Sequence, residues 1–266
     1  MLYEEKLYAI REVAELTGIK PVTLRAWQRR YNIIQPQRTE KGHRLYTSDN
    51  IEQIRTIQGW LAQGVAIGKV KLLLDSEHVA EPTESDVDSQ LEEVQVTLSA
   101  LAQLNRQKVE STLSMVLKEY PLDIIMTRFL PPIFEAIDQV KRSQQTLQLG
   151  LFQSILLARL TLIIESENKA ARNGRCLLLS YDPLGSIEMR LWALQLADRG
   201  YSMSFIEGID DVSALQSNVG LDRYAMVAVF ASQAPSTAQL VPLEALSASL
   251  GSQFTASSLL NTLLTV

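Results

Sequence analysis

The first 47 residues contain the pattern that most constrains the fold of this chain. Two short amphipathic segments, Arg11–Leu16 and Pro21–Arg30, are separated by a turn that contains Gly18. Glycine can adopt a positive φ there without a Cβ clash, and Pro21 suits the first position of a helix because its missing N–H needs no partner. A basic segment at residues 35–47 then has the pattern of a β-hairpin. Two helices, a turn and a basic hairpin in this order predict a winged helix-turn-helix domain.

The second of these segments carries two kinds of side chain. Its apolar residues Val22, Leu24 and Trp27 are expected to face the domain core. The opposite face offers cations and hydrogen-bond donors of the kind that read base edges and bind phosphate. These candidate DNA-binding residues are Lys20, Thr23, Arg25, Gln28 and Arg29. Solvated positions are an equal alternative for Gln28 and Arg30, and core positions are favoured for two further aromatic residues, Tyr31 and Trp60.

The basic hairpin supplies a second group of candidate DNA contacts. Gly42 turns the chain, and side chains alternate along the returning arm, so Arg44 and Tyr46 are expected on one face. That arrangement suits two phosphate contacts. A lone histidine at position 43 is interpreted as a hairpin residue and not as a metal ligand. The candidates in the hairpin are Arg38, Lys41, His43, Arg44 and Tyr46.

Charge is distributed unevenly along the chain. Residues 1–75 hold 12 Lys and Arg against 8 Asp and Glu, a balance of +4, whereas the remainder holds 13 against 22, a balance of −9, within a total of −5. A basic N-terminal part joined to an acidic body fits a protein that touches DNA through one end only.

Composition excludes several kinds of site. Cys176 is the single cysteine, which excludes an intrachain disulfide and a paired-cysteine metal site. Both histidines, His43 and His78, lie in the first third of the chain, so no metal site is predicted. The most apolar helical run, Leu151–Ile164, is interrupted by an arginine and is too short to cross a bilayer. With no signal peptide visible, a soluble cytoplasmic protein without a membrane partner is predicted.

Pattern changes divide the chain into four parts. The helix-turn-helix domain is assigned to residues 7–75, and the acidic, proline-containing segment 76–87 is interpreted as a linker. Helical periodicity from 88 to 172 predicts a four-helix bundle with a kink at Pro131-Pro132. Short apolar runs then alternate with helical patterns in residues 173–266, which predicts a small flavodoxin-like α/β domain with a parallel sheet. Its expected strands are Cys176–Ser180, Tyr201–Ile206, Tyr224–Phe230 and, with a weaker pattern, Gln253–Ala256.

Three stretches of the N-terminal part carry a family resemblance. The sequences PVTLRAWQRRY, PQRTEKGHRLY and GKVKLLL occur in this order within residues 7–75, and in this respect the chain resembles the MerR family of transcriptional regulators. The resemblance implies that the second helix enters the major groove while Arg44 and Tyr46 hold the DNA backbone. It also implies dimers on pseudo-palindromic operators, often at promoters whose elements are spaced too far apart.

The body resembles the cobalamin-dependent light-sensing branch of this family in domain order. That branch covers the corrin with bundle residues and ligates cobalt through a histidine in an E-x-H-x-x-G loop after the first strand. Here the bundle positions fall on Lys141, Leu151 and Phe152, and Asp182 stands where the histidine is expected. A hard, anionic carboxylate is a poor ligand for cobalt, so no cofactor is predicted.

The segment after the first expected strand remains a possible ligand loop. Asp182, Gly185 and Ser186 lie at the carboxyl end of a strand, where α/β folds place ligands. The favoured alternative is an ordinary strand-to-helix turn with Ser186 as the N-cap of the next helix.

The closer resemblance is to the MlrA-like branch, MerR-type activators of curli and biofilm genes that lack the cofactor motif. It implies a homodimeric activator that binds a promoter operator in double-stranded DNA, works with RNA polymerase and receives its signal through partner proteins of the diguanylate cyclase or phosphodiesterase type. The alternative is a cobalamin-dependent light-sensing repressor. An enzyme is not predicted, because no nucleophile elbow, P-loop or G-x-G-x-x-G motif is found.

Overall fold

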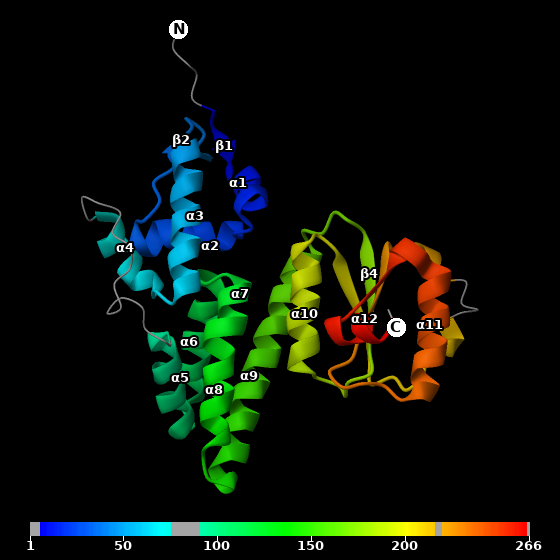
Figure 1. Ribbon diagram of the computed structural model, residues 1–266. Coiled ribbons are helices and arrows are strands. Elements are labelled where there is room, and N and C mark those ends of the chain that lie inside the picture. The colour runs from blue at the N-terminus through cyan, green and yellow to red at the C-terminus, as the bar shows by residue number, and fades with distance from the viewer. Residues whose placement is uncertain (1–5, 76–90, 216–219, 265–266) are drawn as a thin grey trace. The chain divides into compact units, whose positions relative to one another are not determined.

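The computed structural model describes residues 6–75, 91–215 and 220–264. The chain divides into two compact units, Met1–Phe152 and Gln153–Val266, and each is described by itself (Figure 1). The linker expected at residues 76–87, with His78, lies outside the described residues.

The first unit begins with a helix-turn-helix and a small antiparallel sheet. Helix α1 ends at Gly18, whose φ of 73° provides the left-handed turn before Pro21 opens α2. The sheet has the order β1-β3-β2, and β2 and β3 form a hairpin in which Arg38 pairs with Arg44. Gly42 turns the chain within this hairpin with a φ of 80°. The elements are β1 (Tyr8–Ala9), α1 (Ile10–Thr17), α2 (Pro21–Ala26), β2 (Gln37–Arg38), β3 (Arg44–Tyr46), α3 (Ser48–Gln63) and α4 (Ile67–Asp75).

A π-helical turn, Trp27–Tyr31, continues α2 directly. The α-helical and π-helical parts together, residues 21–31, are called the second helix below. A π turn takes one more residue than an α turn and is found mostly as a single wide turn inside a longer helix, frequently at a functional site.

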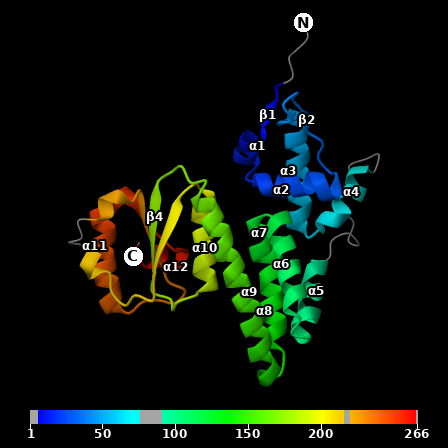
Figure 2. The ribbon, with the colours of Figure 1, turned by 180° about the vertical axis from the view of Figure 1, so that it is seen from behind.

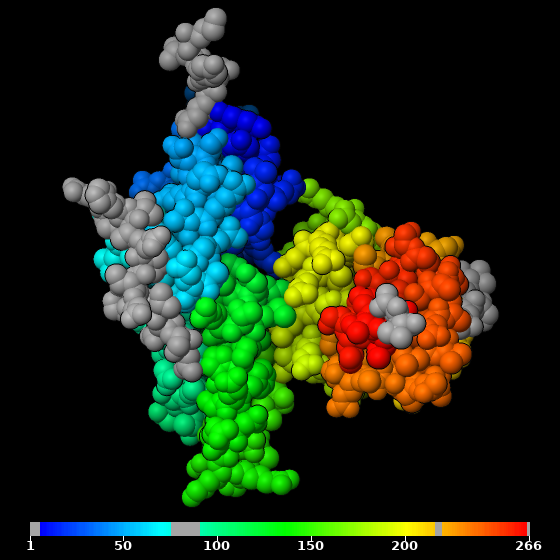
Figure 3. Space-filling model, in the orientation of Figure 1, coloured from blue at the N-terminus to red at the C-terminus, as the bar shows by residue number. Residues whose placement is uncertain are grey.

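The rest of the first unit is a helical bundle. Near the expected kink at Pro131-Pro132 lies a second π-helical turn, Ile125–Phe129, and only Leu130 separates it from Pro131. Because proline has no N–H, the regular α-helical hydrogen bonding cannot be kept through this point. Figure 3 shows atoms of the bundle against atoms of the helix-turn-helix domain. Arg128 Nη2 of the bundle donates to the carbonyl of Ala62 in α3 at 2.7 Å. The bundle consists of α5 (Glu92–Ala102), α6 (Arg106–Glu119), α7 (Leu122–Ile124), α8 (Leu130–Asp138) and the first part of α9 (Arg142–Asn168).

Helix α9 is longer than its most apolar run suggested. It has 27 residues and a mean hydropathy of 1.7 over its most apolar window, so it meets the length and composition needed to cross a bilayer. The core helix of a soluble protein meets the same criteria. Phe152, Leu156 and Leu160 along its length have no exposed surface.

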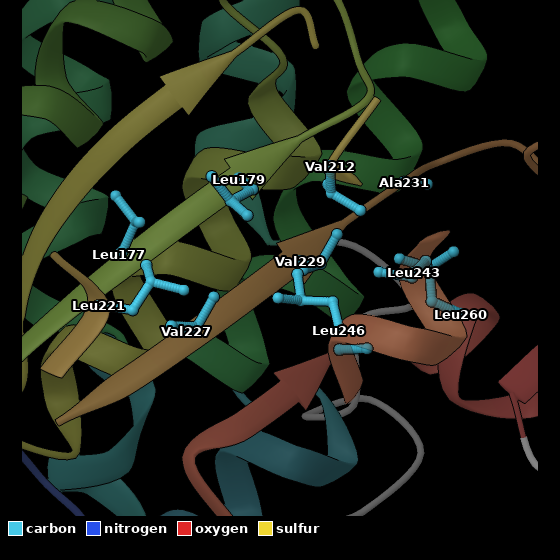
Figure 4. Packing of buried hydrophobic residues seen from close by; sticks show 11 residues of the cluster. Leu177, Leu179, Val212, Leu221, Val227, Val229, Ala231, Leu243, Leu246 and Leu260 are labelled. Carbon is cyan, nitrogen blue, oxygen red and sulfur yellow. The ribbon is translucent and has the colours of Figure 1, made fainter. Parts of the chain in front are cut away.

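The second unit is built on a four-stranded parallel sheet of order β5-β4-β6-β7. Helix α10 lies on one face of this sheet and α11 on the other (Figures 1 and 2). Strands β4 and β6 pack against α11 and α12 through a buried aliphatic cluster, shown in Figure 4, that includes Leu177, Leu179, Val227, Val229, Leu243, Leu246 and Leu260. The elements are β4 (Arg175–Ser180), α10 (Ile187–Asp198), β5 (Ser202–Glu207), β6 (Met226–Phe230), α11 (Thr237–Leu250), β7 (Phe254–Ala256) and α12 (Ser258–Leu264).

Candidate nucleic-acid interface

The second helix buries a face that differs in part from the expected one. Leu24 and Trp27 are fully buried, as predicted. Val22 is 44% exposed, however, and Thr23 is only 3% exposed, so the two neighbours have exchanged the expected positions. The buried side follows the helical repeat through Thr23, Leu24, Ala26 and Trp27, which places Thr23 on the core side. The prediction that Thr23 lies on the outer face of the helix is therefore wrong.

Cationic side chains occupy the outer face of the second helix. Arg25 and Arg29 are exposed, and Lys20 is half-buried at the start of the helix. Gln28, also half-buried, accepts a hydrogen bond at 2.6 Å on its side-chain oxygen from Arg44 Nε of the hairpin. Gln28 thus connects the second helix to the hairpin instead of standing free in solvent.

The hairpin presents most of its expected cations to solvent. Arg38, Lys41 and His43 are exposed, and Arg44 is half-buried beside Gln28. The side chain of Arg44 is therefore held against the second helix. The bond between Arg44 and Gln28 places the hairpin beside the outer surface of the second helix. The charges of Arg25 and Arg44 both act on the phenol of Tyr46.

Tyr46 itself is not on that surface. Its side chain has no exposed area, and its hydroxyl has no hydrogen-bond partner within the part of the chain that the structure describes. Burial raises the pKa of this phenol, and the positive charges of Arg44 and Arg25 oppose the rise. A fully enclosed side chain cannot contact a phosphate, so the predicted direct contact by Tyr46 is corrected: the ring is part of the buried core.

The carboxyl end of the second helix makes contacts that the sequence did not indicate. Trp27 Nε1 donates to the backbone carbonyl of Glu119 at 2.7 Å, and the hydroxyl of Tyr31 donates to Glu119 Oε2 at 2.5 Å. Arg30 forms an ion pair with Glu119 Oε1. Burial and the hydrogen bond to Glu119 raise the pKa of Tyr31. Arg30 and Tyr31 therefore belong to a contact with the bundle, while the expected core position of Trp27 is confirmed.

The polar groups of the candidate ligand loop in the second unit are engaged in hydrogen bonds within that unit. Asp182 is 8% exposed, and its two oxygens accept from the Ser186 hydroxyl and from the backbone N–H of Ser232, each at 2.8 Å. Ser186 Oγ accepts from Met189 N at 3.3 Å and so caps α10, as the alternative interpretation expected. Gly185 has a φ of 85° and donates its N–H to another side chain of the same unit. Among the described residues, no group of three or more His, Cys, Asp and Glu side chains is arranged to hold a metal ion.

Comparisons with known proteins bear on the N-terminal region most directly. Residues 8–77 match the family described as MerR HTH family regulatory protein. The chain is 36% identical over 163 residues to the HTH-type transcriptional regulator MlrA of Salmonella typhimurium, and 35% identical over 164 residues to MlrA of Escherichia coli K12. Each alignment covers 61% of this chain and 65% of the relative, slightly less than two thirds of its length.

A shorter alignment relates the chain to a repressor. It is 37% identical over 70 residues to the HTH-type transcriptional repressor CarH of Myxococcus xanthus, which covers 26% of this chain and 23% of CarH. The resemblance to MerR-type regulators of the MlrA kind, inferred from the sequence, is confirmed by these relationships.

Proposed function

We propose that the chain is a sequence-specific DNA-binding transcriptional regulator, because residues 8–77 match the MerR HTH family. The observation that carries the proposal is the joined cationic surface of the second helix and the hairpin. Arg25 and Arg29 are exposed on the helix, and Arg44 of the hairpin is held to that helix by Gln28.

The second helix and the hairpin would make different kinds of contact with DNA. A helix fits the major groove of B-DNA, where arginine can bind the acceptor atoms of guanine with two hydrogen bonds. Lys20, Arg25 and Arg29 are the candidates for this groove. Phosphate contacts position a protein without reading sequence, and the hairpin candidates for them are Arg38, Lys41, His43 and Arg44.

Arg44 is well suited to a phosphate contact. A guanidinium has five N–H donors in a fixed plane, so the bond from Nε to Gln28 orients the group and leaves its terminal nitrogens to donate elsewhere. A preoriented donor loses less side-chain freedom when it binds. Gln28 is therefore proposed to position Arg44 and not to contact bases itself.

The wider proposal concerns the whole protein. We infer a cytoplasmic homodimer that binds a pseudo-palindromic promoter site, because a two-fold protein matches a two-fold operator. Activation through RNA polymerase, control of biofilm genes and input from a signalling partner such as a diguanylate cyclase or phosphodiesterase remain part of this proposal. The similarity to MlrA, itself a transcriptional regulator, supports the regulatory role.

A cobalamin-dependent repressor is the second candidate, supported by the short alignment with CarH. It is less well supported, because Asp182 replaces the expected cobalt-ligating histidine and both of its oxygens are engaged in hydrogen bonds.

The test uses the full chain and duplexes selected from a random library. Arg44→Ala should weaken binding to every duplex and reduce the slope of log affinity against log salt by about 0.9, the value for one lost phosphate contact. Arg25→Ala should instead change the preference among duplexes. Arg106→Ala, a substitution at an exposed position of the bundle, is the matched control. Equal affinities for Arg44→Ala and the control would refute the proposal.

A further inference from the structure

One acidic residue of the bundle receives three side chains from the second helix. Glu119 is the last residue of α6, and it lies 88 to 92 positions further along the chain than Tyr31, Arg30 and Trp27. One carboxylate oxygen pairs with Arg30, the other accepts from Tyr31, and the backbone carbonyl accepts from the Trp27 indole. Every acceptor group of this residue is thus committed to the DNA-binding domain.

Burial makes these contacts mutually dependent. The Glu119 side chain is 2% exposed, whereas that of Arg30 is 46% exposed. A carboxylate removed from water is costly unless it is paired and hydrogen-bonded. Losing the contact is therefore more costly for the buried Glu119 carboxylate than for the Arg30 guanidinium, which can be hydrated. A movement of α6 that separated them without hydrating the carboxylate would leave a buried charge unpaired, so the second helix is expected to move with α6.

The neighbouring residue extends the junction to another helix of the same domain. Tyr120 is 2% exposed, and its hydroxyl accepts from Ile67 N at 3.3 Å and donates to Glu93 Oε1 at 3.2 Å. Burial raises the pKa of this phenol, which keeps it a hydrogen-bond donor at ordinary pH. The end of α6 therefore holds both the second helix and the start of α4.

The contacts fall in the π-helical turn, Trp27–Tyr31. The same helix presents Arg25 and Arg29 outward from positions interleaved with those that meet the bundle. The orientation of the DNA-facing side chains is consequently tied to the bundle contacts on the opposite side of one short helix.

We propose that Glu119 is a positioning residue for DNA reading, through which the state of the bundle sets the affinity of the second helix for its duplex. The inference rests on the proposed function of DNA binding. Glu119 touches no DNA; it acts through Arg30, Tyr31 and Trp27. Arg30, left open between two roles by its sequence, is assigned to this junction and not to phosphate.

The experiment uses the full chain and the best duplex recovered from the random library. Glu119→Gln keeps the shape of the side chain and the backbone carbonyl that accepts from Trp27 but removes the charge. Glu135→Gln makes the same change at an exposed position of the bundle. We expect Glu119→Gln to lower the affinity about tenfold, within the range typical of coupling between sites, and the control to leave it unchanged. The slope of log affinity against log salt should not change for Glu119→Gln, because no phosphate contact is lost.

Two further measurements separate positioning from a general loss of structure. Arg30→Gln should lower the affinity by about the same factor, and the double variant should be little weaker than either single variant, because both changes remove one interaction. In NMR spectra, the Trp27 indole N–H should exchange faster with solvent in Glu119→Gln without DNA present. If Glu119→Gln fails to fold, Tyr31→Phe removes one hydrogen bond to the same carboxylate and should lower affinity about threefold.

The outcomes distinguish DNA binding by the chain from the positioning role of Glu119. If the unaltered protein retains no duplex, the proposed DNA-binding function fails. If that protein binds but Glu119→Gln and Tyr31→Phe bind as tightly or more tightly, the positioning role is overturned while DNA binding stands. A reduced salt slope for Arg30→Gln would assign Arg30 to phosphate and also overturn it.

Discussion

Replacing Tyr46 by phenylalanine tests the largest disagreement between sequence and structure in the candidate interface. The family resemblance predicts that this hydroxyl binds a phosphate, whereas the structure buries the whole side chain and gives the hydroxyl no hydrogen-bond partner among the described residues. Tyr46→Phe removes only the hydroxyl and keeps the buried ring. The two views therefore predict different results for one substitution.

The magnitude follows from the cost of an unpaired polar group. A buried hydroxyl that exchanges water for no partner costs about 1–3 kcal/mol, and Tyr46→Phe breaks no hydrogen bond in exchange. We expect the free energy of unfolding to rise by about 1 kcal/mol, because small local adjustments recover part of the cost. In a unit of this size, that corresponds to a midpoint about 2–4 °C higher in thermal unfolding.

The advantage of Tyr46→Phe should grow in alkaline solution. Burial raises the pKa of Tyr46, so the folded protein holds the phenolic proton more tightly than the unfolded chain does. The stability associated with that proton is complete below the unfolded pKa of about 10 and is lost as pH rises through the folded pKa. The variant has no such proton, and the other tyrosines titrate in both proteins, so the difference between the two isolates Tyr46.

Urea denaturation followed by circular dichroism, at pH 7.5 and at pH 10.5, measures both effects, and binding to the selected duplex is measured alongside. The expected result is higher stability with unchanged affinity. A loss of about 1 kcal/mol or more at pH 7.5 would show that the hydroxyl has a partner. Weaker DNA binding with a reduced salt slope would show that the hydroxyl does reach a phosphate and would refute its buried position.

Three further predictions concern the rest of the chain. Glu207→Gln should destabilise the second unit by about 3–5 kcal/mol in urea titrations, because the Arg190 guanidinium would stay buried without its charge partner. Arg190 Nη2 donates to the 8% exposed Glu207 side chain at 2.5 Å. The control Glu244→Gln, at an exposed position of α11, should change stability little, and equal losses in the two variants would contradict this expectation. Burial raises the pKa of Cys176 to about 12, so a thiol reagent at pH 8 should react with it only after unfolding, and rapid labelling of the native protein would disprove the buried position. Gly59→Ala should raise the free energy of unfolding by about 0.5–1 kcal/mol, because alanine favours a helix more than glycine does. The added Cβ meets nothing within 4 Å on the exposed side of α3. A decrease in stability would indicate a steric contact at this position.

Local patterns were sufficient to locate most elements. Helical spacing of isoleucines placed α3 correctly, since Ile51, Ile54 and Ile57 are all buried. The apolar run Cys176–Ser180 became β4, and even the weakly indicated last strand is present as β7 (Phe254–Ala256). These elements could be predicted because a period of about 3.6 or 2 residues is itself the physical requirement for one buried face.

Finer features depended on contacts that no local pattern contains. Val22 and Thr23 are neighbours of similar size, so the hydrophobic rule favoured burying the wrong one of the pair. Their true order is set by how the helix is rotated against the remainder of the domain. Glu119 could not have been found, because its partners lie about 90 positions away and a glutamate near the end of a helix carries no distinguishing signal. The hydrogen bond between Gln28 and Arg44 could not be predicted either, because it depends on how the hairpin packs against the second helix.

The π-helical turn at Trp27–Tyr31 has a consequence for how such a chain tolerates change in length. Each residue rotates an α-helix by about 100°, so deleting one residue within this turn would restore regular α-helical bonding and swing every later side chain by that angle. Arg30 and Tyr31 would then move away from Glu119, although the start of the helix, with Arg25, kept its composition. A single amino acid thus sets the rotation between the part of the helix proposed to enter the groove and the part that contacts Glu119.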